Sequence, residues 1–377
     1  MDKLTILTIV GTRPELIRLS RVINKLDLYF NHVIAHTGQN YDYELNQIFF
    51  ENLEIRKPDV FFNVAADTPG KTIGNILIET DKFLINKKID ALLILGDTNS
   101  CLCSIIAKRR KIPIFHMEAG NRCFDLRVPE EINRKIVDHI ADINLTYSSI
   151  AKEYLIKEGL SPEKIICVGS PMKEVINYYL PKILDSKILN NLSLTKNKYF
   201  LFSCHREENL DNEENLFKLF DVIDNLSEIY KLPIIFSVHP RTKLKIEEYK
   251  KTFSPLVKLL KPLGFFDYLK LQIDSKVVLS DSGTITEESS ILNFPALNIR
   301  NTHERPEGME ESSVMLVGMN IQRILQALNI LEDQKRGDMR TLNLVEDYSS
   351  DNVSEKIVRI ILSYVDYTNI YNWKKYL

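Results

Sequence analysis

Residues 4–14 read Leu-Thr-Ile-Leu-Thr-Ile-Val-Gly-Thr-Arg-Pro, and this stretch decides the fold of the chain. Its first part, Leu4–Val10, is an unbroken apolar and β-branched run, which predicts a strand buried on both faces of a sheet. A turn at Gly11–Pro14 follows, and an amphipathic helical pattern continues to about Leu26. A buried strand, a glycine turn and a helix in this order predict the first unit of a parallel α/β sheet.

Strand-like and helix-like runs alternate along the rest of the chain, and the alternation restarts after a polar segment at residues 185–198. We therefore predict an α/β protein with two Rossmann-like doubly wound domains that face a cleft. The predicted domains are residues 1–172 and 173–360, and residues 361–377 form a helix and tail that pack back on the first domain. Ligands of such sheets bind at the carboxyl ends of the strands, so we expect the functional residues there.

The composition excludes several classes of protein. The chain of 377 residues is 27% charged with a formal net charge of -2, so no basic field points to nucleic acid. No apolar run reaches the roughly 18 residues that a membrane span needs, and the N-terminus lacks the features of a signal peptide. The five cysteines show neither paired nor zinc-binding spacing, so we expect no metal and a reduced, cytoplasmic compartment.

Acidic side chains follow the predicted strands of the first domain. Asp97 comes after the apolar run Ala91–Leu95, Glu118 follows the next such run, and Glu130 opens a helix that also carries Arg134. Two of them have a structural alternative, since Asp97 can cap the next helix and Glu130 can pair with Arg134 one turn later. Because strand ends share one edge of a sheet, the three acids together are better explained as a proton-transfer set.

The second domain carries a candidate anion site at residues 281–288, Asp-Ser-Gly-Thr-Ile-Thr-Glu-Glu. A strand end, a glycine turn and a helix start expose backbone N–H groups and hydroxyls that suit a diphosphate. The alternative is a capped helix with an acidic first turn. Neither Gly-x-Gly-x-x-Gly nor the Gly-x-x-x-x-Gly-Lys phosphate loop occurs, which argues against a classical nicotinamide site and an ordinary ATPase.

These motifs, in order along almost the whole chain, resemble those of the non-hydrolysing UDP-N-acetylglucosamine 2-epimerases. The matching pieces are Gly-Thr-Arg-Pro-Glu at 11–15, Gly-Asp-Thr at 96–98, Glu-Ala-Gly at 118–120, Pro-Glu-Glu-Ile-Asn-Arg at 129–134, His-Arg-Glu-Glu-Asn at 205–209, Asp-Ser-Gly at 281–283 with Glu-Glu at 287–288, and Glu-Arg-Pro-Glu at 304–307. The resemblance implies the glycosyltransferase-B arrangement, a UDP-sugar substrate held mainly through the second domain, a homodimer, and no cofactor. It also implies C2 epimerisation by elimination of UDP to a 2-acetamidoglycal, followed by re-addition.

The resemblance also implies roles for individual residues. The acids that handle protons would be Asp97, Glu118 and Glu130, with Arg134 and His205 in support. The groups that hold the phosphates would be Arg13, Arg18, His205, Ser282, Gly283 and Thr284, and His239 is a further substrate-binding candidate. Glu288 would bind the ribose, and Tyr268 and Arg305 would lie near the nucleoside.

The chain departs from many family members at residues 120–125, Gly-Asn-Arg-Cys-Phe-Asp, and at Arg18, Thr284 and residues 304–310. At these positions the chain resembles the branch of the family that converts UDP-2-acetamido-2,6-dideoxy-L-talose to UDP-N-acetyl-L-fucosamine for capsule or O-antigen synthesis. Cys123 and Phe124 could offer an apolar surface to a 6-deoxy sugar. The alternatives are epimerisation of UDP-N-acetylglucosamine to UDP-N-acetylmannosamine and, in another class, a glycosyltransferase that uses a UDP-sugar donor.

Overall fold

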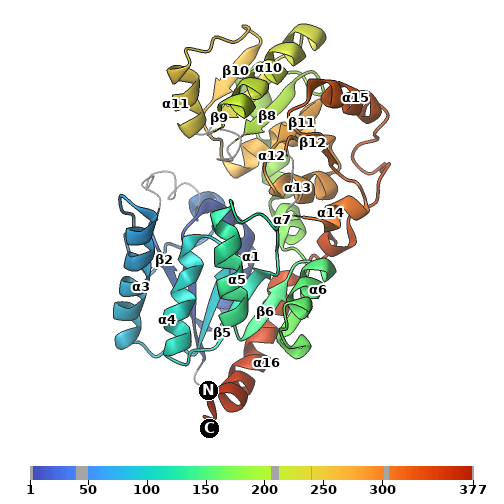
Figure 1. Ribbon diagram of the computed structural model, residues 1–377. Coiled ribbons are helices and arrows are strands. Elements are labelled where there is room, and N and C mark those ends of the chain that lie inside the picture. The colour runs from blue at the N-terminus through green and yellow to red at the C-terminus, as the bar shows by residue number, and fades with distance from the viewer. Residues whose placement is uncertain (1–2, 40–49, 205–211, 239, 301–304, 376–377) are drawn as a thin grey trace. The chain divides into compact units, whose positions relative to one another are not determined.

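A computed structural model describes residues 3–39, 50–204, 212–238, 240–300 and 305–375 (Figure 1). The chain divides into unit 1, Met1–Asn177 with Asp347–Leu377, and unit 2, Tyr178–Glu346. The sequence-based division differs from this one, because residues 173–177 and 347–360 lie in unit 1. Within the described residues, no helix is long and apolar enough to cross a membrane.

The return of the chain to unit 1 has a local cause. Helix α16, Val353–Trp373, begins with the backbone N–H of Ser354 donating to the Glu174 carboxylate at 2.8 Å. Lys356 Nζ donates to the carbonyl oxygen of Val168 at 2.9 Å, and α16 packs along α1. These contacts hold the start of α16 to the end of the first sheet, so unit 1 resumes before residue 360.

Unit 1 is a seven-stranded parallel sheet in the order β3-β2-β1-β4-β5-β6-β7. The strands are β1 Thr5–Val10, β2 Asn31–His36, β3 Val60–Phe61, β4 Ala91–Leu95, β5 Ile114–Ala119, β6 Ile143–Thr146 and β7 Ile165–Cys167. Its helices are α1 Arg13–Tyr29, α3 Pro69–Ile85, η1 Asn99–Cys103, α4 Ser104–Arg109, α5 Pro129–Ile140, α6 Ser149–Lys157, η2 Pro162–Lys164 and, crossing into unit 2, α7 Met172–Asp185, together with α16. The short helix η3, Glu346–Tyr348, stands at the second boundary between the units.

The strand order of unit 1 explains its layers. The chain moves from β1 outward to β3, then returns to β4 and continues outward on the other side. Because parallel crossovers are right-handed, α1 covers one face of the sheet and α3, α4 and α5 cover the other. Figure 1 shows α3, α4 and α5 side by side, and α3 contacts α4 as α4 contacts α5. The buried core under these helices includes Leu92, Ile94 and Val137.

Unit 2 repeats this plan with a six-stranded parallel sheet in the order β10-β9-β8-β11-β12-β13. The strands are β8 Phe200–Cys204, β9 Ile234–Val238, β10 Val257–Leu260, β11 Val277–Ser280, β12 Ala296–Asn298 and β13 Met315–Leu316. The helices are α8 Ile188–Asn191, α10 Glu213–Tyr230, α11 Pro240–Glu248, α12 Phe265–Asp274, α13 Thr284–Leu292, α14 Glu307–Glu310 and α15 Ile321–Leu331. Its core packs the strand residues Phe202 and Phe236 against α10 and α15.

The prediction of two Rossmann-like doubly wound domains is confirmed by these two sheets, and the facing of the domains across a cleft stays a prediction. The strand order reverses between β1 and β4 in unit 1 and between β8 and β11 in unit 2. Ligands of doubly wound sheets bind where the order reverses, at the carboxyl ends of the strands. The turns after β1 and β4, and those after β8 and β11, are therefore the places to examine for a site.

Candidate active site

The turn after β4 carries Asp97. Arg134 of α5 donates from Nε to Asp97 Oδ2 at 2.7 Å, and its Nη2 atom lies at the same distance from that oxygen. The Asn133 amide donates to the carbonyl oxygen of Asp97 at 2.9 Å, so α5 holds both the backbone and the side chain of this residue. The cap of the following helix η1 is Thr98, whose hydroxyl accepts from the N–H of Ser100. The capping alternative for Asp97 is therefore wrong, because Thr98 fills that place.

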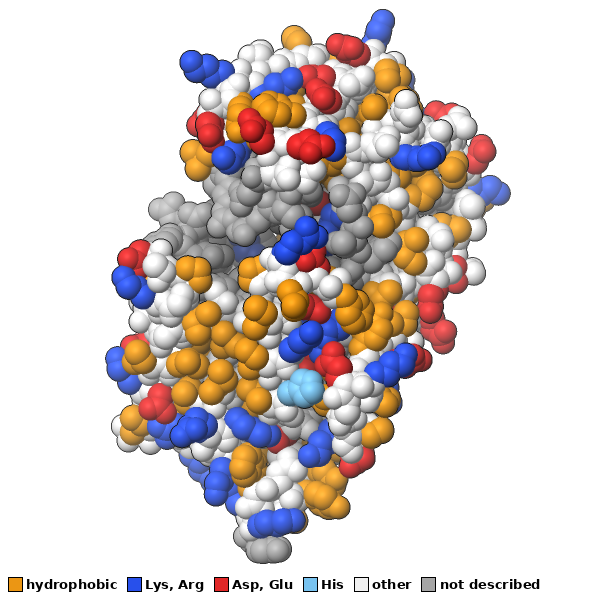
Figure 2. Space-filling view, viewed as in Figure 1, with side chains coloured by type: hydrophobic (Ala, Val, Ile, Leu, Met, Phe, Trp, Pro, Cys, Tyr) orange, Lys and Arg blue, Asp and Glu red, His pale blue; other side chains and the backbone are white. Residues whose placement is uncertain are grey.

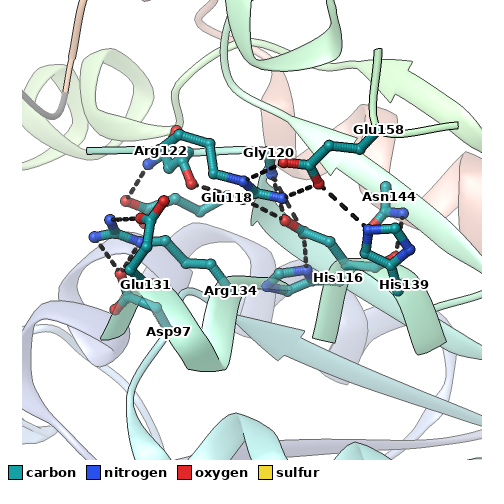
Figure 3. Close-up of polar contacts among 12 residues, drawn as sticks. Asp97, His116, Glu118, Gly120, Arg122, Glu131, Arg134, His139, Asn144 and Glu158 are labelled. Carbon is teal, nitrogen blue, oxygen red and sulfur yellow. Dashed lines mark hydrogen bonds and ion pairs between the residues drawn. The ribbon is translucent and has the colours of Figure 1, made fainter. Parts of the chain in front are cut away.

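Glu118 lies inside the end of β5 and not after it as predicted. The register of β5 with β6 shifts between Met117 and Ala119, and Glu118 itself adopts φ +63°. Its carboxylate accepts from the Asn121 amide at 3.1 Å and lies 3.5 Å from Arg18 Nη1. A Cβ atom on Gly96 would stand 3.9 Å from Glu118 Oε2. The Glu118 carboxylate therefore sits over the turn that leads to Asp97 (Figure 3).

The first turn of α5 separates the two adjacent glutamates that the sequence places there. Glu130 is half-buried, whereas Glu131 is fully buried. Glu131 Oε2 accepts from Arg134 Nη1 at 3.0 Å and from the Cys123 N–H at 3.2 Å. Arg134 thus joins Asp97 to Glu131 (Figure 3). Sequence reasoning missed Glu131 because either glutamate is within helical reach of Arg134, at i,i+3 or i,i+4, and only the rotation of the helix decides between them.

Glu15 is a second buried carboxyl group that sequence reasoning did not single out. Its oxygens accept from the N–H groups of Gly11 and Thr12, at 2.6 Å and 3.2 Å, and from the Thr98 hydroxyl at 2.6 Å. It therefore ties the turn after β1 to the turn after β4. Burial raises the pKa of Glu15 to about 7, and the hydrogen bonds that it accepts lower it only in part. The capping-box spacing of Thr12 and Glu15 was the signal in the sequence.

The two arginines of the α1 segment occupy different environments. Arg13 begins the helix and is half-buried. Arg18 is buried, with its guanidinium 3.5 Å from the Glu118 carboxylate and 5.7 Å from the centre of the Tyr147 ring. In this structure the charge of Arg18 is thus directed at Glu118, and its predicted contact with phosphate stays a prediction.

In unit 2, the turn after β11 carries Ser282, Gly283 and Thr284. The Ser282 N–H donates to Ser280 Oγ at 3.1 Å, and the Ser282 and Thr284 hydroxyls lie 3.0 Å apart. Helix α13 begins at Thr284, as predicted, with no side-chain cap. Hydroxyls and backbone N–H groups therefore gather at a helix start beside the point where the strand order reverses, which is an arrangement suited to an anion.

The other predicted nucleotide-binding residues of unit 2 surround α13. Glu288 is buried and accepts from the Gln272 amide at 2.6 Å, while Arg305 lies 3.3 Å from the buried Glu287. The Tyr268 hydroxyl donates to Ser203 Oγ at 3.0 Å, and burial raises its pKa. Of the remaining candidates, His205 and His239 lie outside the described residues.

The two turns of unit 1 together offer carboxylates on adjacent strands with arginines behind them. Such groups can take a proton from carbon, return one, and stabilise charge that develops in between. Among the described residues, no group of three or more His, Cys, Asp or Glu side chains could hold a metal ion.

Comparison with known proteins agrees with this geometry. The model of the family described as UDP-N-acetylglucosamine 2-epimerase matches residues 24–362. The UDP-N-acetylglucosamine 2-epimerase of Methanocaldococcus jannaschii is 36% identical, over 94% of this chain and 97% of its own. The UDP-2,3-diacetamido-2,3-dideoxy-D-glucuronate 2-epimerase of Pseudomonas aeruginosa is 32% identical, over 83% of this chain and 88% of its own.

Solved structures give the same result. The structure of UDP-N-acetylglucosamine 2-epimerase from Rickettsia bellii is 51% identical with a TM-score of 0.92, and the match covers 99% of this chain and 100% of that one. The M. jannaschii enzyme in complex with UDP-GlcNAc and UDP is 34% identical with a TM-score of 0.88, and the match covers 96% of this chain and 100% of that one. The chain therefore belongs to the UDP-N-acetylglucosamine 2-epimerase family and is an isomerase.

Proposed function

We propose that this chain inverts C2 of a UDP-2-acetamido sugar by eliminating UDP and adding it back. The observation that carries the proposal is the pair of carboxylates, Asp97 and Glu118, at the ends of the adjacent strands β4 and β5, each beside an arginine. The epimerase family of the chain and the UDP-sugar complex of its relative support the same reaction. The proposal assigns the nucleotide to the turn and helix start at Ser282–Thr284, and proton transfer to unit 1.

The reaction needs two proton transfers and no net redox change. A carboxylate removes the C2 proton, the C1=C2 bond forms, and the C1–O bond breaks with its electron pair leaving on UDP. An acid then delivers a proton to the opposite face of C2, and a β-phosphate oxygen of UDP adds to C1. Asp97, Glu118 and Glu130 are the proposed base and acids, and the hydroxyls and N–H groups of residues 282–284 are proposed to stabilise the departing diphosphate.

For the sugar, we propose UDP-2-acetamido-2,6-dideoxy-L-talose, which would become UDP-N-acetyl-L-fucosamine for capsule or O-antigen synthesis. The supporting observation is in the loop after Glu118, where Phe124 is 69% exposed. Its ring packs edge-to-face against the Tyr154 ring, with 5.2 Å between the ring centroids. An exposed aromatic ring suits a methyl group better than a hydroxymethyl group. Cys123 offers no such surface, because it is buried with its sulfur 3.4 Å from Glu131 Oε2.

UDP-N-acetylglucosamine is the second candidate substrate, and the names of the M. jannaschii and R. bellii relatives favour it. Incubation of the enzyme with each UDP-sugar in D2O, followed by NMR, separates the candidates. The proposed reaction puts deuterium at C2 and forms the C2 epimer without any acceptor. A glycosyltransferase would leave C2 protonated, and that result with both sugars would refute the epimerase proposal.

We also propose that the chain forms a homodimer through the outer surface of α3 and α5. Ile78, Ile132 and Ile136 are exposed there by 51%, 52% and 38%. Hydrophobic side chains gather over α3, α4 and α5 in Figure 2. Sedimentation of the Ile132→Asp variant should show a monomer, whereas Ile229→Asp, on the exposed side of α10, should leave the assembly unchanged. A monomeric parent protein would refute this assignment.

A further inference from the structure

A chain of alternating charges lies buried beneath the Glu118 turn of unit 1. His116 Nδ1 stands 2.9 Å from Asp138 Oδ1, and Arg122 Nη1 donates to Asp138 Oδ2 at 2.8 Å. Arg122 also donates to both carboxylate oxygens of Glu158, at 2.8 Å and 2.6 Å. His116, Asp138 and the side chain of Arg122 are buried, whereas Glu158 and His139 at the end of this row of charges are partly exposed. Figure 3 shows the contacts between them. The proton-transfer scheme uses none of these residues.

The Glu118 turn needs such support because its backbone is strained. Glu118 has φ +63° and Gly120 has φ +81°. A side chain with Cβ in this left-handed region costs about 1–2 kcal/mol, so the conformation persists only if its surroundings hold it. The Gly120 N–H donates to both Asp138 oxygens, at 3.3 Å and 3.2 Å. A Cβ atom on Gly120 would lie 2.4 Å from the Ala151 carbonyl oxygen, so no larger residue fits at the position that is hydrogen-bonded to Asp138.

His116 extends the same support to the Asp97 turn. Its Nε2 atom lies 2.8 Å from the carbonyl oxygen of Gly96, the residue before Asp97. Nε2 therefore has a hydrogen-bonding partner and Nδ1 lies close to a carboxylate oxygen, and only the doubly protonated imidazolium carries a proton on both nitrogens. Burial alone would lower the pKa of His116, but the hydrogen bond and charge of Asp138 raise it above its ordinary value. The opposing charges of His116 and Arg122 lower the pKa of Asp138 against the effect of burial.

We propose that His116, Asp138 and Arg122 are positioning residues, which fix the Glu118 and Asp97 carboxylates relative to each other for proton transfer at C2. The proposal rests on the proposed epimerase function. Asp138 holds the Glu118 turn through Gly120, and His116 joins Asp138 to the Asp97 turn through Gly96. Arg122 pairs with the other oxygen of the Asp138 carboxylate and also pairs with Glu158. A shift of one carboxylate by about 1 Å is enough to slow such a reaction about a hundredfold.

The Asp138→Asn variant tests this role, and Asp142→Asn is its matched control. Asp142 is also buried, and it pairs with Lys108 at 2.6 Å, but it accepts from the N–H of Ile114 at the other end of β5. Both substitutions should lower thermal stability, since each removes the negative charge of a buried carboxylate that is paired with a cation. Only Asp138→Asn should lower kcat, by about tenfold to a hundredfold, with KM and UDP affinity nearly unchanged. An equal loss of kcat in both variants, or in neither, would overturn the positioning role.

A readout that does not depend on catalysis keeps this test separate from that of the proposed function. In ¹⁵N NMR of the unliganded protein near neutral pH, both His116 ring nitrogens should carry protons, and the Gly120 amide should exchange slowly with solvent. In Asp138→Asn, the ring should become neutral and Gly120 should exchange faster. A neutral His116 ring in the parent protein would refute the network, whereas an intact network without C2 exchange in the parent would refute the epimerase proposal alone.

A second variant applies if Asp138→Asn does not fold. Glu158→Gln changes the partly exposed end of the network and leaves Asp138 in place. It should lower kcat by a smaller factor, roughly twofold to fivefold, because a partly exposed ion pair contributes less than a buried one. The Glu153→Gln control, on the same helix with its carboxylate 3.4 Å from Lys157, should leave kcat unchanged. An unchanged kcat in Glu158→Gln would count against the role of Arg122.

Discussion

The two units share one architecture but differ in the groups at their strand ends. In unit 1 the turns beside the reversal of strand order carry ionisable groups, with Asp97 against Arg134 and Glu118 against Arg18. In unit 2 the corresponding turn carries one buried acid, Asp281, and otherwise neutral donors, the hydroxyls of Ser282 and Thr284 with the N–H groups of a helix start. We propose that this edge of the sheet supplies proton transfer in unit 1 and anion binding in unit 2. The fold fixes where side chains converge, and the local sequence fixes what they can do.

The strongest way to break this contrast is to neutralise an acid of unit 1. Glu118→Gln and Asp97→Asn should each lower kcat by about 10²- to 10⁴-fold, because a positioned acid or base contributes that much. Affinity for UDP, measured by calorimetry, should stay within about twofold, since UDP lacks the sugar on which these acids are proposed to act. Glu153→Gln on exposed α6 is the control. A large loss of UDP affinity in either variant would mean that the units do not divide the work in this way.

The second prediction is that the buried Glu15 makes the free energy of unfolding depend on pH. Its pKa is raised from 4.5 to about 7 on folding, so the unfolded chain loses this proton first as the pH rises, and stability falls across that window. Glu15→Gln removes this titration. Its stability relative to the parent should therefore rise between about pH 5 and pH 8, by up to ~3 kcal/mol. Urea unfolding at both pH values measures the change, and a constant difference between the two proteins would contradict it.

A smaller effect is expected when a neutral donor of unit 2 is removed. Ser282→Ala should weaken UDP binding by about tenfold, which corresponds to one hydrogen bond to a charged group. The value of kcat at saturating substrate should fall less than it does for Glu118→Gln. Calorimetry with UDP and initial rates measure the two quantities. If Ser282→Ala binds UDP as tightly as the parent, the anion site lies elsewhere in unit 2.

The smallest effect is expected at Tyr268. Its hydroxyl bonds to Ser203 Oγ, so Tyr268→Phe should cost about 1 kcal/mol of stability and change UDP affinity by less than about threefold. Tyr199→Phe is a matched control, because its buried hydroxyl donates to the Leu271 carbonyl oxygen at 2.7 Å. A tenfold loss of UDP affinity in Tyr268→Phe alone would show that the Tyr268 hydroxyl binds the nucleotide, and it would place the nucleotide next to α12 in unit 2.

Most of the architecture could be predicted from the sequence because buried parallel strands are continuous apolar runs. The apolar run Ala91–Leu95, for example, coincides with strand β4. The short strands β3, β10 and β13 were missed, since each lies at an edge of its sheet and none of its residues is fully buried.

For the site, the sequence indicated which turns carry chemistry but not how their charges pair. Glu130 and Glu131 are equivalent by spacing, and only the rotation of α5 buries Glu131 against Arg134. The sequence predicts only that His116 lies near the end of a strand. No pattern in the neighbouring residues indicates that Asp138, 22 residues later, lies against its ring. Such pairs form between separate elements, so their partners depend on packing and not on the local pattern.

By itself, the sequence determined two doubly wound parallel sheets and the short polar turns that follow their strands. This follows because apolar runs must be buried and because parallel strands end at one edge. Only the tertiary structure decided that Arg18 faces Glu118 and that Glu15 joins the turn after β1 to the turn after β4. It also decided that Asp138 supports the strained turn at Glu118. The physical reason is that a buried charge takes its partner from whichever elements fold around it, and those elements are far apart in the sequence.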